Sequence, residues 1–138
     1  MADAAASSSL KQAFQSHLRE TEGHVARLET IFRGVKVDPK RETCEAMKGL
    51  ISEGEDMISA TGDSDVKDAA LIAAAQRVEH YEISGYGTAR TIAQRLGLTD
   101  VAALLQQTLE EEKNADAKLT QLATTALNAK AVRAHGSD

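Results

Sequence analysis

Residues 71–89, LIAAAQRVEHYEISGYGTA, determine the fold class of this chain. Apolar residues recur in this stretch at alternating steps of three and four, which is the spacing of residues on one face of an α-helix. The same face continues over about residues 66–96, and it carries Leu71, Ala75, Val78, Glu82, Tyr86 or Gly85, Ala89, Ala93 and Leu96. The stretch therefore predicts a long helix in which a carboxylate lies in phase with the apolar residues.

Three further helices are predicted on either side of this one. They cover about residues 10–32, 42–58 and 100–126, and glycine or proline residues separate them. Long helices joined by short loops are typical of an up-and-down bundle, so we predict an all-α fold with four helices. We expect a single domain over residues 1–138, structured over about residues 10–126 and flexible over 1–8 and 128–138.

Composition supports a helical, globular protein. The 138 residues contain one proline, no tryptophan and only 3% aromatic residues, which excludes an all-β fold. Hydrophobic residues make up 42% and charged residues 27%, the proportions of a domain with one core. The chain is therefore long enough to bury a single core.

Charge and cysteine content exclude several classes of function. The net charge is −5, and its 16 basic residues are interspersed with 21 acidic ones, so the basic stripe of a nucleic-acid-binding protein is missing. Cys44 is the single cysteine, which rules out a disulfide within the chain. The sequence shows neither a leader peptide nor a membrane span, so we expect a cytoplasmic protein that does not bind membranes.

Polar residues occupy the middle of three of the four predicted helical faces, where core residues belong. The pairs on one side of a helix are Glu20 with His24, Glu79 with Glu82, and Glu112 with Asp116. A buried carboxylate without a partner is costly, so several of them in one core must share protons, pair with cations or bind metal. Carboxylates and imidazoles suit iron or manganese, and we predict that these six residues bind two metal ions. His17, Thr21 and Tyr86 are expected beside them.

Each of these signals also has an ordinary structural explanation. His24 alone is compatible with a satisfied core histidine, the Glu79–Glu82 turn with an exposed charged turn, and Glu111–Lys113 with a solvated face. Their coincidence at the same level of three helices favours the metal site. The alternative is a non-catalytic helical protein whose polar core shares protons without metal, and which oligomerises or docks a partner.

The sequence resembles the ferritin-like YciE/YciF family of bacteria. The matching residues run through His17–Glu29, Cys44–Gly54, Ala73–Ile83, Tyr86–Ala89 and Glu111–Asp116, and the run QRVEHYEI at 76–83 is the most specific of them. The resemblance implies a bundle similar to rubrerythrin, in which residues 42–58 form a helical crossover, and a centre of two metal ions, iron or else manganese.

Carried over by motif, the resemblance assigns Glu20 and His24, Glu79 and Glu82, and Glu112 and Asp116 as ligands from three helices. The sequence departs from the usual Glu-x-x-His spacing, because Thr21 precedes His24 by three residues and Asp116 stands in the last helix where related proteins place histidine. Family members also carry an earlier helix with a ligand glutamate, and this sequence starts at about the end of that helix. We therefore expect a homodimer or a higher homo-oligomer, in which a second chain completes the bundle.

These observations lead to one functional expectation. The protein is expected to be a metal-binding protein of the bacterial stress response, whose centre reacts with a small oxidant, dioxygen or peroxide. The resemblance leaves open whether this centre turns over as an oxidoreductase.

Overall fold

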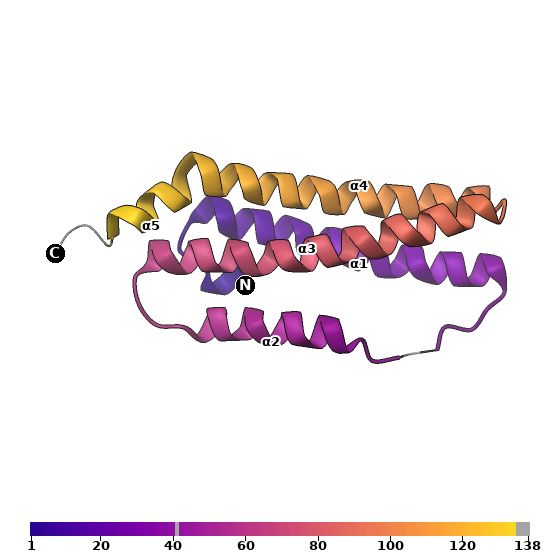
Figure 1. The fold of residues 1–138 in the computed structure, drawn as a ribbon, viewed down its shortest axis with the longest axis horizontal. Coiled ribbons are helices and arrows are strands. Elements are labelled where there is room, and N and C mark those ends of the chain that lie inside the picture. The colour runs from indigo at the N-terminus through magenta and orange to yellow at the C-terminus, as the bar shows by residue number, and fades with distance from the viewer. Residues whose placement is uncertain (41, 135–138) are drawn as a thin grey trace.

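The chain folds into a bundle of long helices, which the computed structural model describes for residues 1–40 and 42–134 (Figure 1). A 3-10 turn at Ala2–Ala4 precedes α1 (Ser8–Val35), and a linker leads to α2 (Glu45–Ser59). The two halves of the last hairpin are α3 (Ser64–Arg95) and α4 (Thr99–Leu122). A π-helical turn (Ala123–Leu127) then connects α4 to α5 (Asn128–Ala134). The predicted all-α fold is confirmed.

The long helices α1, α3 and α4 run side by side, and the shorter α2 packs on α3 (Figure 1). The hairpin of α3 and α4 has the most extensive interface, and α1 packs along α4. Gly97, with φ of 71°, makes the sharp turn between the two hairpin helices, a left-handed conformation that glycine adopts without steric cost.

The apolar core is divided into two parts. One cluster, at the amino-terminal ends of α1 and α3, includes Leu10, Leu71, Ile72, Leu119 and Leu127. A smaller cluster at the opposite end consists of Ala93, Ala102 and Leu105, with Leu28, Ile31, Tyr86 and Val101 packed against it. Between these clusters the helices bury His24, Glu79, Thr108 and Glu112, alongside the apolar Leu109. These polar side chains form a polar layer across the middle of the bundle.

Asp68 of α3 ties the amino-terminal segment to the bundle. Its side chain is fully buried, and its two oxygens accept hydrogen bonds from the backbone N–H groups of Ala6 and Ser7 at 2.9 and 2.7 Å. These bonds satisfy donors just ahead of α1, which explains how a carboxylate can be buried at this position.

The structure differs from the predicted boundaries mainly at the ends of the chain. Residues 2–4 and 128–134, which we expected to belong to flexible ends, are helical, and the neighbouring Ala5 and Leu127 are buried in the core. Residues 135–138 of that prediction lie outside the described residues. Helix α2 begins three residues later than predicted, since the Cys44 thiol caps it by accepting from the Met47 N–H. Among the described residues no helix is long and apolar enough to cross a membrane.

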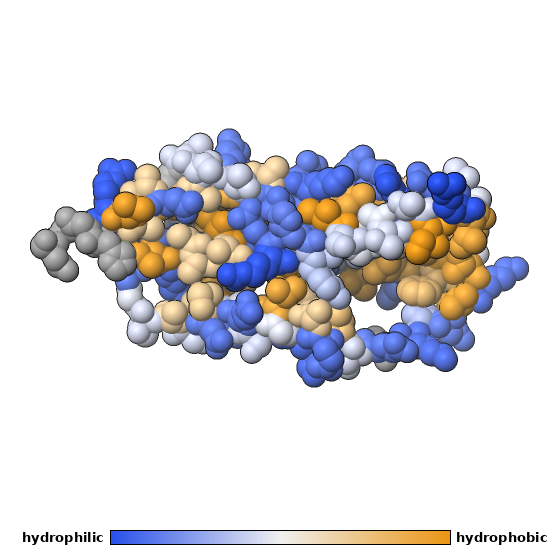
Figure 2. Space-filling model, in the orientation of Figure 1, coloured by the Kyte–Doolittle hydropathy of each residue, from blue (hydrophilic) through white to orange (hydrophobic). Residues whose placement is uncertain are grey.

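Apolar side chains also lie on the surface, near the turn between α3 and α4. Ile92, Leu96 and Leu98 are exposed there, and Val37 of the linker before α2 is exposed as well. Figure 2 shows a large apolar area at this end of the molecule, next to a mostly hydrophilic middle.

Candidate metal centre

The polar layer brings together side chains from α1, α3 and α4. His17 of α1, Glu79 of α3 and Glu112 of α4 each offer a ligand atom, and these three atoms lie within 4.8 Å of one another. His17 Nε2 is 3.2 Å from Glu79 Oε1 and 3.5 Å from Glu112 Oε2. One imidazole and two carboxylates converging in this way form a donor set suited to iron, manganese or zinc.

A second histidine approaches the other oxygen of Glu112. His24 Nδ1 lies 3.1 Å from Glu112 Oε1, and both side chains are buried, with exposed fractions of 2% and 0%. Glu112 therefore lies between the two histidines, with Oε2 toward His17 and Oε1 toward His24. A carboxylate in this position can bridge two metal ions.

Several buried polar atoms of this layer have no hydrogen-bond partner among the described residues. They are His24 Nδ1, Glu79 Oε2, Glu112 Oε1 and Glu112 Oε2. Buried polar atoms in native proteins are nearly always satisfied, and those that are not call for an explanation such as a bound ion. Four such atoms on three neighbouring side chains fit a metal ion, which binds through free lone pairs.

The remaining predicted residues surround this cluster at different distances. Glu20 Oε2 is 3.3 Å from His17 Nδ1, and its side chain is 44% exposed. The Thr21 hydroxyl donates to the backbone carbonyl of His17, so its proton is engaged within α1. The Tyr86 ring packs edge-on against His24, with ring centroids 6.2 Å apart.

Asp116 is not brought into the cluster. Its Oδ1 accepts a hydrogen bond of 2.8 Å from Gln76 Nε2 and lies 3.3 Å from His80 Nε2. Asp116 lies one turn beyond Glu112 on α4, and the side chains of α3 that reach it are Gln76 and His80, one on either side of Glu79 in the sequence. The structure thus assigns Asp116 to a contact between α3 and α4, separate from the three converging ligand atoms.

From the sequence we did not predict that Glu111 binds His24 and Arg27, and we expected His17 to lie next to the metal ligands without being one of them. Glu111 accepts from His24 Nε2 at 2.8 Å and from both terminal nitrogens of Arg27 at 2.8 and 3.1 Å. The spacing of Arg27 three residues after His24, on the same side of α1, was a signal that could have indicated such a partner.

In the absence of a bound cation, the surroundings of the layer raise the pKa values of Glu112, His17 and Glu82 and so favour their protonated forms. Burial raises the pKa of Glu112 to about 8, and the neighbouring Glu82 and Glu79 carboxylates add to the effect. The hydrogen bond to Glu79 raises the pKa of His17 to about 9, although burial opposes this. Burial, followed by the Glu79 charge, also raises the pKa of Glu82, which places this predicted ligand in the same negative field.

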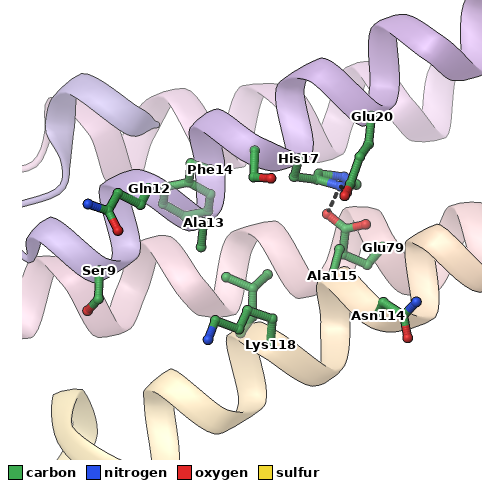
Figure 3. Close-up of a pocket in the computed structure, with 12 residues that line it drawn as sticks. Ser9, Gln12, Ala13, Phe14, His17, Glu20, Glu79, Asn114, Ala115 and Lys118 are labelled. Atoms are coloured by element: carbon green, nitrogen blue, oxygen red, sulfur yellow. Dashed lines mark hydrogen bonds and ion pairs between the residues drawn. The ribbon is translucent and has the colours of Figure 1, made fainter.

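A groove connects the layer to solvent (Figure 3). It has a volume of about 320 Å³, and its walls are formed by α1 and α4. Figure 3 shows His17 and Glu20 pointing toward Glu79 at one end, with Asn114 and Ala115 of α4 opposite. Phe14 and Leu119 give the groove an apolar wall, and Lys118 lies farther along it. A small molecule can therefore reach the His17 side of the layer.

Comparison with known proteins places the chain in one group. A family model described as "Domain of unknown function (DUF892)" matches residues 1–132. The chain is 48% identical to Protein YciF of Escherichia coli (strain K12) over 132 residues, which are 95% of this chain and 80% of that protein.

Two solved structures share the fold. The crystal structure of the E. coli stress protein YciF has a TM-score of 0.85 and 44% identity, and the match covers 99% of this chain and 82% of that one. YcfI from Rhodopseudomonas palustris has a TM-score of 0.82 and 39% identity, covering 86% and 76%.

Proposed function

This chain belongs to the DUF892 family, and we propose that it is a ferritin-like metal-binding protein of the bacterial stress response. Its centre would hold two metal ions, iron or else manganese, between α1, α3 and α4. The stress response enters by similarity, since the E. coli relative is described as a stress protein.

The observation that carries the proposal is the set of unsatisfied acceptor atoms in the polar layer. His24 Nδ1, Glu79 Oε2 and both oxygens of Glu112 are buried without hydrogen bonds among the described residues. Hydrogen bonding normally offsets the cost of burying these groups, and metal ligation or a shared proton would take its place here.

The residues would divide into two binding positions. His17, Glu79 and Glu112 Oε2 would form one, with Glu20 at its exposed side, and His24 with Glu112 Oε1 would begin the other. Glu82 is proposed as a further ligand beside these positions, because it is half-buried and follows Glu79 by three residues on α3. When bound, a pair of iron ions supplies the redox chemistry for reaction with dioxygen or peroxide.

The surroundings of the centre would control which small molecules reach it. The groove beside His17 admits a small oxidant, and the apolar clusters on both sides of the layer limit the entry of water. Burial and the Glu82 charge raise the pKa of Tyr86 to about 12, so its phenol keeps its proton and can donate a hydrogen bond toward a ligand carboxylate.

The test of this proposal is metal loading without oxygen. The protein is incubated anaerobically with Fe(II) or Mn(II), passed over a desalting column and analysed for metal content. We expect about two ions per chain, retained by Glu22→Ala and lost by Glu82→Ala and Glu112→Ala. Absence of retained metal in the unmodified protein would overturn the proposal.

The second candidate is a metal-free protein whose polar core shares protons. The close approach of His17 to Glu79 and Glu112 favours it, because a protonated imidazole there places a positive charge beside two carboxylates at once. The two candidates differ in their response to ligand, since a bound metal stabilises the fold and a chelator removes that stabilisation. A melting temperature that is unchanged by metal and by chelator supports the metal-free candidate.

We also propose that the chain forms a homodimer. Leu18 and Val25 of α1 are 59% and 55% exposed, and Ile92 and Leu96 of α3 are 54% and 68% exposed. A second copy could cover such surface. Light scattering at micromolar concentration tests this, and a monomer there would contradict it.

A further inference from the structure

Two neighbouring glutamates of α4 have opposite surroundings. Glu112 is fully buried and accepts no hydrogen bond, whereas the carboxylate of Glu111 accepts four. The donors to Glu111 are His24 Nε2 at 2.8 Å, Arg27 Nη1 at 2.8 Å, Arg27 Nη2 at 3.1 Å and Gln107 Nε2 at 3.1 Å. Glu112 thus has free lone pairs for a ligand, and Glu111 has none left.

Arg27 holds Glu111 in one orientation. Two guanidinium nitrogens bind the two carboxylate oxygens separately, the bidentate arrangement that fixes the plane of a carboxylate. Arg27 Nη1 also donates to the Thr108 hydroxyl, which is buried on α4 one turn before Glu111 and Glu112. The side chains of Arg27 and Glu111 are 13% and 26% exposed, so solvent screens this pair only in part.

The orientation of Glu111 determines which nitrogen of His24 carries the proton. A carboxylate paired with arginine is ionised and only accepts hydrogen bonds, so His24 Nε2 must donate to it. In the neutral ring the lone pair then lies on Nδ1, which is 3.1 Å from Glu112 Oε1 and has no hydrogen-bond partner. The free lone pair of His24 is therefore on the side of the ring that faces the polar layer.

We infer that Glu111, clamped by Arg27, is a positioning residue that keeps the proton of His24 on Nε2 and presents Nδ1 as a metal ligand beside Glu112. The half of this inference that concerns metal rests on the proposed function, and the half that concerns the proton on His24 does not. Metal-binding histidines commonly donate their second N–H to a carboxylate, and loss of that partner typically lowers metal affinity by roughly 10- to 100-fold.

The first measurement concerns the metal-free protein alone. Nitrogen chemical shifts of the His24 ring, obtained by long-range 15N–1H NMR on the full chain at neutral pH, distinguish the two neutral tautomers. We expect the Nε2–H form in the unmodified protein and in Glu110→Gln, a neighbouring exposed residue of α4 that serves as the control. In Glu111→Gln we expect a mixture of both forms.

The second measurement is metal affinity. Competition with a chelating dye should show that Glu111→Gln binds Fe(II) or Mn(II) roughly 10- to 100-fold more weakly, and that Glu110→Gln binds as the unmodified protein does. Arg27→Lys should weaken binding as well, because lysine keeps the charge but cannot grip both oxygens of Glu111. Cobalt(II) substitution adds a spectroscopic signature, since the absorption bands of the bound ion change when a histidine nitrogen leaves its coordination.

The outcomes separate the inference from the proposed function. An Nδ1–H form of His24 in the unmodified protein would overturn the inference, and so would a Glu111→Gln variant with unchanged tautomer and unchanged affinity. If the unmodified protein keeps the Nε2–H form but retains no metal, the proposed function fails while the role of Glu111 in orienting His24 stands.

Discussion

Replacing Glu112 with glutamine removes a carboxylate that the fold buries at a cost. The side chain is fully buried, and burial together with the charges of Glu82 and Glu79 raises its pKa from 4.5 to about 8. At neutral pH the unfolded chain has this group ionised and the folded protein keeps it protonated, so folding must take up a proton. Glu112→Gln is therefore expected to stabilise the metal-free protein.

The size of the effect follows from linkage between protonation and folding. One pKa unit corresponds to about 1.4 kcal/mol, so the difference between 4.5 and neutral pH gives an upper limit of about 3 kcal/mol. Loss of the contact with His17 reduces this gain, and we expect about 1 to 2 kcal/mol, or a melting temperature higher by roughly 3 to 8 °C. Because the cost appears above the unfolded pKa of 4.5 and grows until pH reaches about 8, the gain should vanish near pH 4.5.

Thermal and urea unfolding of the metal-free protein, at neutral pH and near pH 4.5, measures both parts of this prediction. Glu22→Gln is the matched control, because Glu22 is exposed on α1 and its replacement should leave stability unchanged. The same Glu112→Gln protein should lose metal binding, so stability and binding should change in opposite directions. A variant less stable than the unmodified protein at neutral pH, or equally stabilised at both pH values, would refute the reasoning.

Three further predictions address other parts of the molecule. Metal uptake at neutral pH should release protons, because His17 and Glu112 have pKa values of about 9 and about 8 and must lose their protons to bind a metal. Metal affinity should therefore rise with pH up to about 9, and titration calorimetry in several buffers measures both effects. Asp68→Ala should destabilise the fold by about 1 to 3 kcal/mol in urea unfolding, because two backbone N–H groups lose their acceptor. Leu10→Ala should cost about 2 to 5 kcal/mol by cavity formation and leave the number of bound metal ions unchanged in the folded protein.

The helices could be predicted well because their periodicity and their breaks are local. Gly97 and the residues around Gly62 mark the turns, and the apolar line through Leu71 and Ala75 identifies the buried face of α3. The ends of the chain were predicted less well. The burial of Ala5 and Leu127 depends on contacts with distant residues, and a short segment of sequence does not reveal them.

The sequence indicated the level of the bundle at which carboxylates and imidazoles meet, but not which of these side chains contact one another. The phase of Glu112 with the apolar residues of α4 correctly indicated that it is buried. On α3 the in-phase residue was Glu82, which is half-buried, and the buried carboxylate is its neighbour Glu79. Glu111 and Asp116 were harder, because a rotation of α4 by a fraction of a turn decides which of its acidic residues faces which neighbour. Arg27 binds Glu111 and Gln76 binds Asp116, and both contacts join residues at least 40 positions apart in the sequence.

The most direct test of the account is the metal content of the protein after anaerobic loading, compared between the unmodified chain and Glu112→Gln. The account predicts about two ions of iron or manganese per chain in the first and nearly complete loss in the second. A folded, unmodified protein that retains no metal, or a Glu112→Gln protein that retains as much as the unmodified one, would contradict a metal centre built around Glu112.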